Sequence, residues 1–211
     1  MPLAVEIWSD VVCPWCYIGK RRFENALAQF EHRDEVDVRF RSFELDPTAP
    51  EAVDGPAAER LAEKYGISVE EAEASQAQLT AMAAAEGLEY HLDRTRGGNT
   101  FDAHRLLQLA AQEGVQAEAK ERLMHAYFTE SLPISDAETL VRVVSEAGVD
   151  PEQARATLDS DRYADAVRED EHLAQRIGIQ GVPFFVLNRR YGVSGAQPAE
   201  ILVQALERAW E

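Results

Sequence analysis

The segment from Ala4 to Cys16 reads AVEIWSDVVCPWC, and it decides the fold. Its first five residues are rich in β-forming side chains, which predicts a strand over residues 4–8. Pro14 suits the first position of a helix, because the backbone N–H that it lacks would have no partner there. The two cysteines, Cys13 and Cys16, therefore stand where a strand turns into a helix.

The residues that follow extend this start into a β-α-β unit. Apolar side chains spaced as on one face of a helix occur at Phe23, Ala26, Leu27 and Phe30. Residues 36–41 alternate between apolar and polar side chains, which predicts a second strand. Two prolines in the segment 46–50 break the pattern, and we interpret this segment as a linker.

The β signal returns near the C-terminus. Residues 182–187 form a continuous apolar run, which is typical of a buried strand. A turn over 188–190 leads to a hairpin partner over 191–194. The last helix is amphipathic, with an apolar face made of Ile201, Leu202, Ala205, Leu206 and Ala209. Both ends of the chain therefore contribute to one predicted four-stranded sheet.

The middle of the chain, from about 55 to 178, predicts about six helices. Capping boxes are expected at Ser68-x-x-Glu71 and Ser135-x-x-Glu138, and residues 150–151 (Asp-Pro) mark another helix start. Residues 88–90 are interpreted as a short extended piece. Glycines stand where helices should end, at Gly66, Gly87, Gly114, Gly148 and Gly178. This block is predicted to pack over the sheet as an insertion.

Composition excludes several classes of protein. The 211 residues are 45% apolar and 28% charged, as in an average folded domain. The net charge of −17 repels phosphate backbones and anionic lipid, so we expect neither a nucleic-acid nor a membrane partner. No apolar run reaches membrane-spanning length, and the N-terminus lacks the pattern of a signal peptide. We therefore expect a cytoplasmic location.

The spacing of the cysteines predicts redox chemistry. Two thiols three positions apart at a helix start can reach disulfide distance. Unpaired N–H groups at the helix end favour a thiolate at Cys13, so we expect an exposed Cys13 with a lowered pKa and a buried Cys16. Cys13 would attack a disulfide, and Cys16 would resolve the mixed disulfide. Asp10 is interpreted either as a helix cap or as a like charge that raises the thiol pKa.

Two other interpretations of the cysteines are weaker. A structural zinc site needs four ligands, whereas there is no second cysteine pair and the five histidines lack metal-ligand spacing. The second alternative is two inert buried cysteines. Such cysteines would have no need to stand at a strand-to-helix turn with Pro14 between them. We expect no metal and no organic cofactor.

Four segments together resemble the DsbA-like thioredoxin-fold oxidoreductases, in their FrnE-type branch. These segments are Ser9-Asp10-Val11-Val12-Cys13-Pro14-Trp15-Cys16-Tyr17-Ile18-Gly19, Ser42-Phe43-Glu44-Leu45-Asp46-Pro47, Asn99-Thr100-Phe101-Asp102-Ala103-His104-Arg105-Leu106 and Gly178-Ile179-Gln180-Gly181-Val182-Pro183-Phe184-Phe185. The resemblance covers essentially the whole chain. It implies an α/β protein with a thioredoxin fold over 1–50 and 178–211, interrupted by an all-helical domain over 51–177.

The resemblance also implies an activity and a site. The activity is dithiol/disulfide exchange through Cys13 and Cys16, on a protein or on a small molecule such as glutathione. Pro183 is implied to be cis and to face the cysteine pair. The dipeptide Pro14-Trp15 lacks the histidine of strongly oxidising members, so we expect a more reducing pair.

Five further residues are candidates for substrate binding. Trp15, between the cysteines, offers an apolar contact or simply lies on the surface. Val182 can pair through its backbone with an extended substrate. The resemblance brings Asn99, Phe101 and His104 near the thiols, although ordinary packing is the simpler interpretation of a lone histidine.

A second function stays open from the sequence. Kappa-class glutathione transferases and hydroxychromene-carboxylate isomerases are similar in fold and length, but they usually carry serine where Cys13 stands. The alternative is therefore a glutathione-linked transferase or isomerase acting on a small aromatic substrate. A non-enzymatic chaperone or binding module is a third interpretation. The presence of both thiols favours disulfide exchange.

Overall fold

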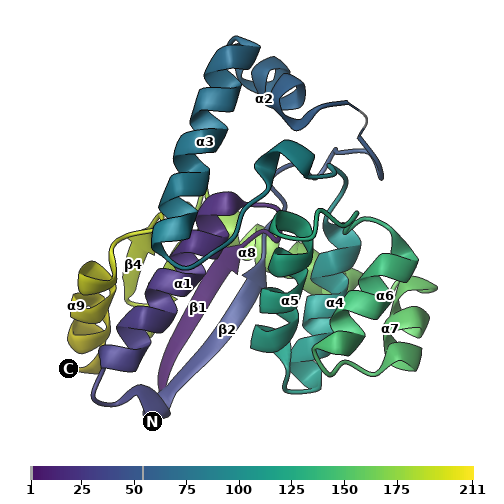
Figure 1. Cartoon of the computed structure of the whole chain (residues 1–211). Coiled ribbons are helices and arrows are strands. Elements are labelled where there is room, and N and C mark those ends of the chain that lie inside the picture. Colours follow the sequence, from purple (N-terminus) through teal and green to yellow (C-terminus); the bar gives the residue numbers. More distant parts are fainter. Residues whose placement is uncertain (1, 54) are drawn as a thin grey trace.

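The computed structural model describes residues 2–53 and 55–211. Its sheet contains β1 (Leu3–Ser9), β2 (Val36–Ser42), β3 (Phe184–Leu187) and β4 (Tyr191–Ser194), in the order β2-β1-β3-β4 (Figure 1). β1 is parallel to β2 and antiparallel to β3, and β3 is antiparallel to β4. The prediction that both chain ends share one sheet is confirmed.

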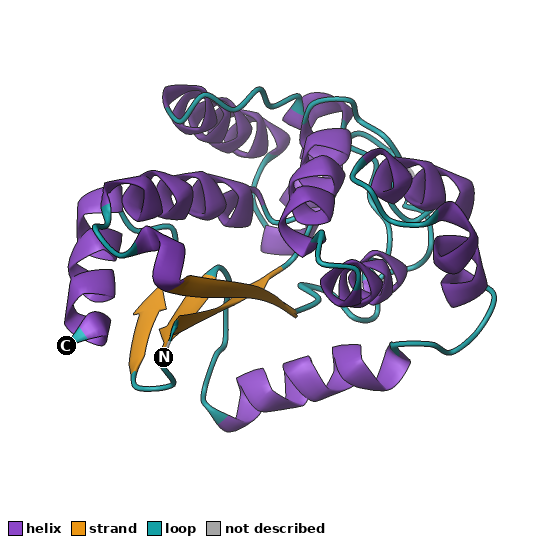
Figure 2. Cartoon of the chain, turned by 90° about the horizontal axis from the view of Figure 1, so that it is seen from below, coloured by secondary structure: helices purple, strands orange, loops and turns teal. Residues whose placement is uncertain are grey.

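Helices cover both faces of the sheet (Figure 2). On one face, α1 (Pro14–Gln29) and α9 (Ala199–Trp210) pack on alternate residues of β1, including Val5 and Ile7. On the other face, Trp8 packs with residues of α8 (Ala164–Arg176) and the turn after it. Because β1 is covered on both sides, its side chains are buried along nearly its whole length.

The helical block contains seven α-helices among the described residues, one more than the sequence predicted. Besides α8 they are α2 (Ala57–Tyr65), α3 (Val69–Ala85), α4 (Phe101–Gln112), α5 (Gln116–Phe128), α6 (Ala137–Glu146) and α7 (Pro151–Leu158), with 3-10 turns at Arg33–Glu35 and Leu92–Arg94. α2 and α3 form a hairpin that projects beyond the rest of the molecule (Figure 1). No helix in the described part of the chain is long and apolar enough to cross a bilayer.

Three local predictions need correction. The capping box at Ser68 forms, but the one expected at Ser135 does not, because α6 begins one residue later and the Asp136 side chain accepts the N–H of Thr139. Residues 88–90 are irregular rather than extended strand. The strand predicted over 182–187 begins only at Phe184, because residues 182–183 form a bend that contacts the cysteine turn.

A buried polar cluster joins the sheet to the helical block. The Asp170 carboxylate, on α8, accepts hydrogen bonds from the Ser42 N–H at 2.9 Å and from the Gln108 side chain at 2.7 Å. It also pairs with Arg41 at 2.7 Å, and Arg41 pairs with Glu6 on β1. One carboxylate therefore connects β2, α4 and α8 at the end of the sheet where the cysteine turn begins.

We predict that Asp170→Ala lowers the free energy of unfolding by about 3–5 kcal/mol, because it leaves the buried Ser42 N–H without a partner and removes one of the two carboxylates that pair with Arg41. Urea unfolding followed by circular dichroism measures the change. Glu169→Ala is the control, since Glu169 is the exposed neighbour of Asp170 on the same helix. Equal stability of the two variants would contradict this account of the cluster.

The bend before β3 touches the middle of α1 at a glycine. A Cβ atom placed on Gly19 would lie 2.8 Å from Pro183 Cγ and 3.4 Å from Ala196 Cβ. The first distance is too short for any ordinary carbon contact, so Gly19 allows α1 and the Pro183 bend to approach each other.

We predict that Gly19→Ala destabilises the protein by about 1–2 kcal/mol, because overpacking costs about 1–3 kcal/mol and the higher helix propensity of alanine returns up to about 1 kcal/mol. Gly181→Ala is the matched control: it lies near the same bend, and no atom stands within 4 Å of its added Cβ. Thermal unfolding of both variants tests the prediction, which requires the larger loss for Gly19→Ala.

Candidate active site

The cysteines lie at the junction of β1 and α1, as predicted. Cys13 is the N-cap residue of α1 with an extended backbone (φ −84°, ψ 112°), and Pro14 follows it. The Cys13 carbonyl accepts hydrogen bonds from the N–H groups of Cys16 at 3.0 Å and Tyr17 at 3.3 Å. Both cysteines are free thiols. Both cysteines therefore lie at the first turn of α1, separated by Pro14 and Trp15.

The prediction of an exposed Cys13 is wrong. Cys13 is 4% exposed and Cys16 is 1% exposed. The Cys13 Sγ donates to the Val182 carbonyl at 3.6 Å, so the bend before β3 covers it. Tyr17 and Tyr90 belong to the same apolar cluster as both cysteines. Cys13 is therefore buried by segments that are remote from it in the sequence.

The predicted lowering of the Cys13 pKa is wrong as well. The side-chain hydrogen bond with Cys16 favours the protonated Cys13 thiol and raises the pKa of Cys13 well above its usual value, and burial and the charge of Cys16 act in the same direction. The Cys16 backbone N–H lowers this pKa but is outweighed. The charge of Asp10 raises it further, so Asp10 acts as a like charge, and α1 has no side-chain cap. Desolvation and the second sulfur therefore outweigh the helix end.

Pro183 lies beside the cysteine turn. The Val182–Pro183 peptide bond is cis, and the Val182 carbonyl before it accepts from Cys13 Sγ. The Pro183 ring packs against Gly19 of α1. The sequence interpretation did not single out Gly19 as a site residue. The sequence did offer a signal for it, because a glycine inside a predicted helix often stands where another segment packs closely against the helix.

Asp10 and His104 form a buried pair behind the turn. The His104 Nε2 atom and the Asp10 Oδ1 atom are 3.3 Å apart. The other Asp10 oxygen accepts the Leu45 N–H at 2.8 Å. Burial alone would raise the pKa of Asp10, but the hydrogen bond and charge of His104 more than compensate, and this pKa is lowered. His104 therefore lies beside the cysteine turn and contacts it through the Asp10 carboxylate.

The remaining candidates for substrate binding differ in whether they contact the cysteine turn. Trp15 is 43% exposed, directly between the buried cysteines. Asn99 instead bonds to the linker, through its N–H to the Pro50 carbonyl at 2.9 Å. Phe101 packs under the Arg168 guanidinium, 4.2 Å from its ring centre. Of the three residues expected from the segment 99–106, His104 is the one that contacts the turn.

Two residues near the turn were missed from the sequence. Lys120, on α5, is 0% exposed and donates to the Ser9 carbonyl at 3.0 Å. Burial lowers the pKa of Lys120 to about 8. The Tyr90 hydroxyl donates to the Pro14 carbonyl at 2.8 Å, and burial followed by the charge of Cys13 raises its pKa. A lysine in an amphipathic helix gives no signal of burial, since lysine is almost always exposed.

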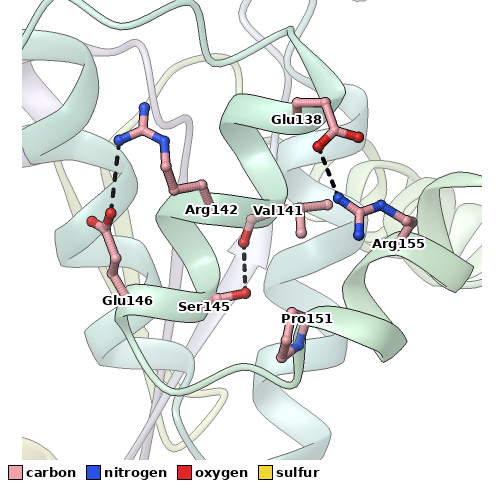
Figure 3. A pocket seen from close by; sticks show the side chains of 7 residues that line it. All are labelled: Glu138, Val141, Arg142, Ser145, Glu146, Pro151 and Arg155. Carbon is pink, nitrogen blue, oxygen red and sulfur yellow. Dashed lines mark hydrogen bonds and ion pairs between the residues drawn. The ribbon is translucent and has the colours of Figure 1, made fainter.

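Other parts of the structure offer less chemistry. In the described residues, no three histidine, cysteine, aspartate or glutamate side chains are grouped as a metal site. A surface depression between α6 and α7 is lined by Glu138, Val141, Arg142, Ser145, Glu146, Pro151 and Arg155 (Figure 3). Its charged groups pair with one another, as Glu138 does with Arg155 at 2.8 Å. The cysteine turn is therefore the candidate active site.

Several solved structures of known proteins resemble this chain. A structure of the probable DsbA oxidoreductase SCO1869 from Streptomyces coelicolor is 50% identical, with a TM-score of 0.94, over 99% of this chain and 90% of that one. The cytosolic disulfide reductase DsbM from Pseudomonas aeruginosa with GSH shares the fold at 18% identity and a TM-score of 0.68, over 98% of both chains. A 2-hydroxychromene-2-carboxylate isomerase also shares it, at 16% identity and a TM-score of 0.69, over 97% of this chain and 95% of that one.

The match to a family is broad enough to assign the chain. Residues 4–207 match the DSBA-like thioredoxin domain. This range includes the sheet, the helical block, the cysteine turn and the Pro183 bend. The chain belongs to the DSBA-like thioredoxin domain family.

Proposed function

We propose that this protein is a thiol:disulfide oxidoreductase that uses Cys13 and Cys16 as its redox pair. The observation that carries the proposal is the pair of free thiols in one helical turn, with Cys13 Sγ bonded to the Val182 carbonyl beside Pro183. A transferase or isomerase site would not need the second thiol. Membership of the family supports the same activity.

The reaction has two exchange steps. The Cys13 thiol loses its proton, and its sulfur attacks one sulfur of a substrate disulfide, so that a mixed disulfide forms and the first substrate thiolate leaves. The Cys16 sulfur, after losing its proton, then attacks Cys13 Sγ and releases the second substrate thiolate. The substrate disulfide is reduced to two thiols, and the cysteine pair is oxidised to a disulfide. The reverse steps oxidise a dithiol substrate.

The substrate is proposed to be a thiol or disulfide, in a protein or in a small molecule such as glutathione. Trp15 supplies an exposed apolar surface next to the pair, and the Val182 carbonyl supplies an acceptor that an extended chain can use. The glutathione-bound DsbM structure supports the small-molecule case. DsbM is cytosolic, and we propose the same location for this protein.

The alternative is a glutathione-linked transferase or isomerase acting on a small aromatic substrate. The observation that favours it is the shared fold of the 2-hydroxychromene-2-carboxylate isomerase. Both functions use the first position of the motif, but disulfide exchange alone uses Cys16. The role of Cys16 therefore separates them.

We predict that Cys16→Ala abolishes the acceleration by the protein of insulin reduction by dithiothreitol. Incubated with insulin in the absence of dithiothreitol, the variant should instead accumulate a mixed disulfide at Cys13, because no neighbouring thiol remains to resolve it. Turbidity follows insulin reduction, and mass spectrometry detects the trapped adduct. Cys13→Ala is the control, which should lose both turnover and the adduct. Full turnover by Cys16→Ala would refute disulfide exchange and favour the alternative.

We predict an alkaline pH profile for the alkylation of Cys13. Because the pKa of this thiol is raised, its thiolate fraction should grow about tenfold per pH unit between pH 7 and 9. Peptide mass spectrometry after limited treatment with iodoacetamide measures the rate at Cys13 itself. An alkylation rate that no longer changes with pH below pH 8 would show the opposite: the helix N-terminus would then lower the pKa of Cys13 by more than burial and Cys16 raise it.

A further inference from the structure

Asp10 stands at the start of the cysteine turn, and its two carboxylate oxygens contact two segments that are remote in the sequence. Oδ1 lies 3.3 Å from Nε2 of His104 on α4, and Oδ2 accepts the N–H of Leu45, in the segment after β2, at 2.8 Å. The side chains of Asp10 and His104 are each 1% exposed. The exchange steps described above use neither of them, so the pair needs another explanation.

Nε2 of His104 is the donor in this pair. Burial raises the pKa of Asp10, but the hydrogen bond and charge of His104 and the Leu45 N–H more than reverse this effect, and the pKa is lowered. The carboxylate is therefore ionised at neutral pH and can only accept hydrogen bonds. Asp10 thus receives two directional bonds from two different segments.

Among the described residues, few directional contacts hold Cys13 besides those of α1 itself. Its backbone N–H donates to the Asp10 carbonyl at 3.4 Å, which is longer than an ordinary N–H to oxygen bond. The contact of its Sγ with the Val182 carbonyl uses a weak thiol donor and is lost when the thiol reacts. Val11 is fully buried, but apolar contacts have no direction. The position of Cys13 therefore depends on how Asp10 is held.

The two segments that hold Asp10 are themselves anchored. His104 lies in the first turn of α4, where its backbone N–H donates to the Thr100 carbonyl at 3.0 Å. In the segment after β2, Glu44 donates its backbone N–H to the Glu171 carboxylate of α8 at 3.2 Å. Asp10 therefore connects the cysteine turn to two helices of the helical block.

We propose that His104 is a positioning residue, which holds the Asp10 carboxylate and, through the turn, keeps the Cys13 sulfur aligned for the resolution step. The inference rests on the proposed function. In this step the Cys16 thiol loses its proton to solvent, the Cys16–Cys13 bond forms, and the bond between Cys13 and the substrate sulfur breaks. The substrate sulfur leaves with the electron pair and takes a proton from solvent. His104 exchanges no proton and acts through Asp10.

The test measures the two exchange steps separately with an excess of 5,5′-dithiobis(2-nitrobenzoate). The reduced protein releases one coloured thiolate when Cys13 attacks the reagent, and a second when Cys16 resolves the adduct. The first rate depends on reagent concentration, whereas the second does not, because it is intramolecular. Stopped-flow absorbance records both.

Two substitutions of similar size differ in whether they keep the donor. His104→Leu removes it, and we expect the second release to slow about tenfold or more, because a misplacement of about 1 Å can slow a reaction about a hundredfold. His104→Gln keeps an N–H donor toward Asp10, and its second release should stay within about threefold of the unaltered protein. A His104→Gln variant as slow as His104→Leu would overturn the proposal.

His125→Leu is the matched control. His125 also pairs with a carboxylate, that of Glu130 at 3.2 Å, but its side chain is 45% exposed on α5. Its loss should leave both releases within about twofold. If it slows the second release as much as His104→Leu does, the effect is not specific to the turn and the proposal is wrong.

Substitution of Asp10 separates position from charge. Asp10→Asn removes the charge but keeps an oxygen for the Leu45 N–H and an amide group toward His104. We expect its second release within about threefold of the unaltered protein, and that of Asp10→Ala slowed about tenfold or more. Equal slowing of both variants would assign the effect to charge and contradict the proposal.

The outcomes also distinguish this inference from the proposed function. If the unaltered protein shows no second release, Cys16 does not resolve the adduct and the proposed function fails. If both releases occur and His104→Leu alters neither, the His104–Asp10 pair serves only the packing of the core, and the inference fails while the function stands.

A measurement on the unaltered protein guards against poor folding of the variants. The Leu45 side chain is 41% exposed, and its amide donates to Asp10 Oδ2. We expect NMR to show this amide protected from hydrogen exchange by a factor of about 100 or more, because it must leave Asp10 before it exchanges. Exchange at the rate of an unprotected amide would show that Asp10 is not held in place, and would overturn the proposal.

Discussion

The burial of the turn from Ser9 to Cys13 constrains how the other segments pack, because this turn carries polar groups and the Cys13 thiol into the core. Three polar groups of the turn have partners from three different segments. The Ser9 carbonyl accepts from Lys120 of α5, and Asp10 pairs with His104 of α4. Cys13 Sγ donates to the carbonyl of Val182, in the bend before β3. These three hydrogen bonds reduce the free-energy cost of burying the turn.

This arrangement explains why the helical block cannot be regarded as an appendage to the sheet. It supplies His104 and Lys120 at the turn, and Tyr90, whose hydroxyl donates to the first residue of α1. The same block carries Asp170, which bonds to the end of β2. The parallel pairing of β1 and β2 brings Ser9 and Ser42 to the same end of the sheet, so the contacts of the turn and those of Asp170 lie close together there. Active-site electrostatics and domain packing are therefore linked.

The electrostatics of the pair follow from burial more than from the helix. A helix N-terminus stabilises a thiolate by a modest amount, whereas removing a charged sulfur from water and placing it beside a second sulfur raises the Cys13 pKa strongly. Asp10, whose pKa is lowered by His104, adds further negative charge near Cys13.

Sequence patterns alone predicted the order of the strands and helices along the chain, the sheet built from both chain ends, and the position of the cysteines at a strand-to-helix turn. These features depend on periodicity, proline placement and spacing, which are local properties of the chain. Small shifts, such as the start of α6 after Asp136 rather than Ser135, reflect competition between neighbouring residues that can both cap a helix.

Only the tertiary structure decided the environment of the thiols. The burial of Cys13 depends on Val182, which is 169 positions away in the chain. The burial of Lys120 depends on the packing of α5 against β2 and the end of β1. Gly19 is needed because the Pro183 ring packs directly on it. No local sequence pattern predicts which distant segments will cover a side chain. Solvation, and with it the pKa of a thiol or an amine, is therefore decided when the chain folds.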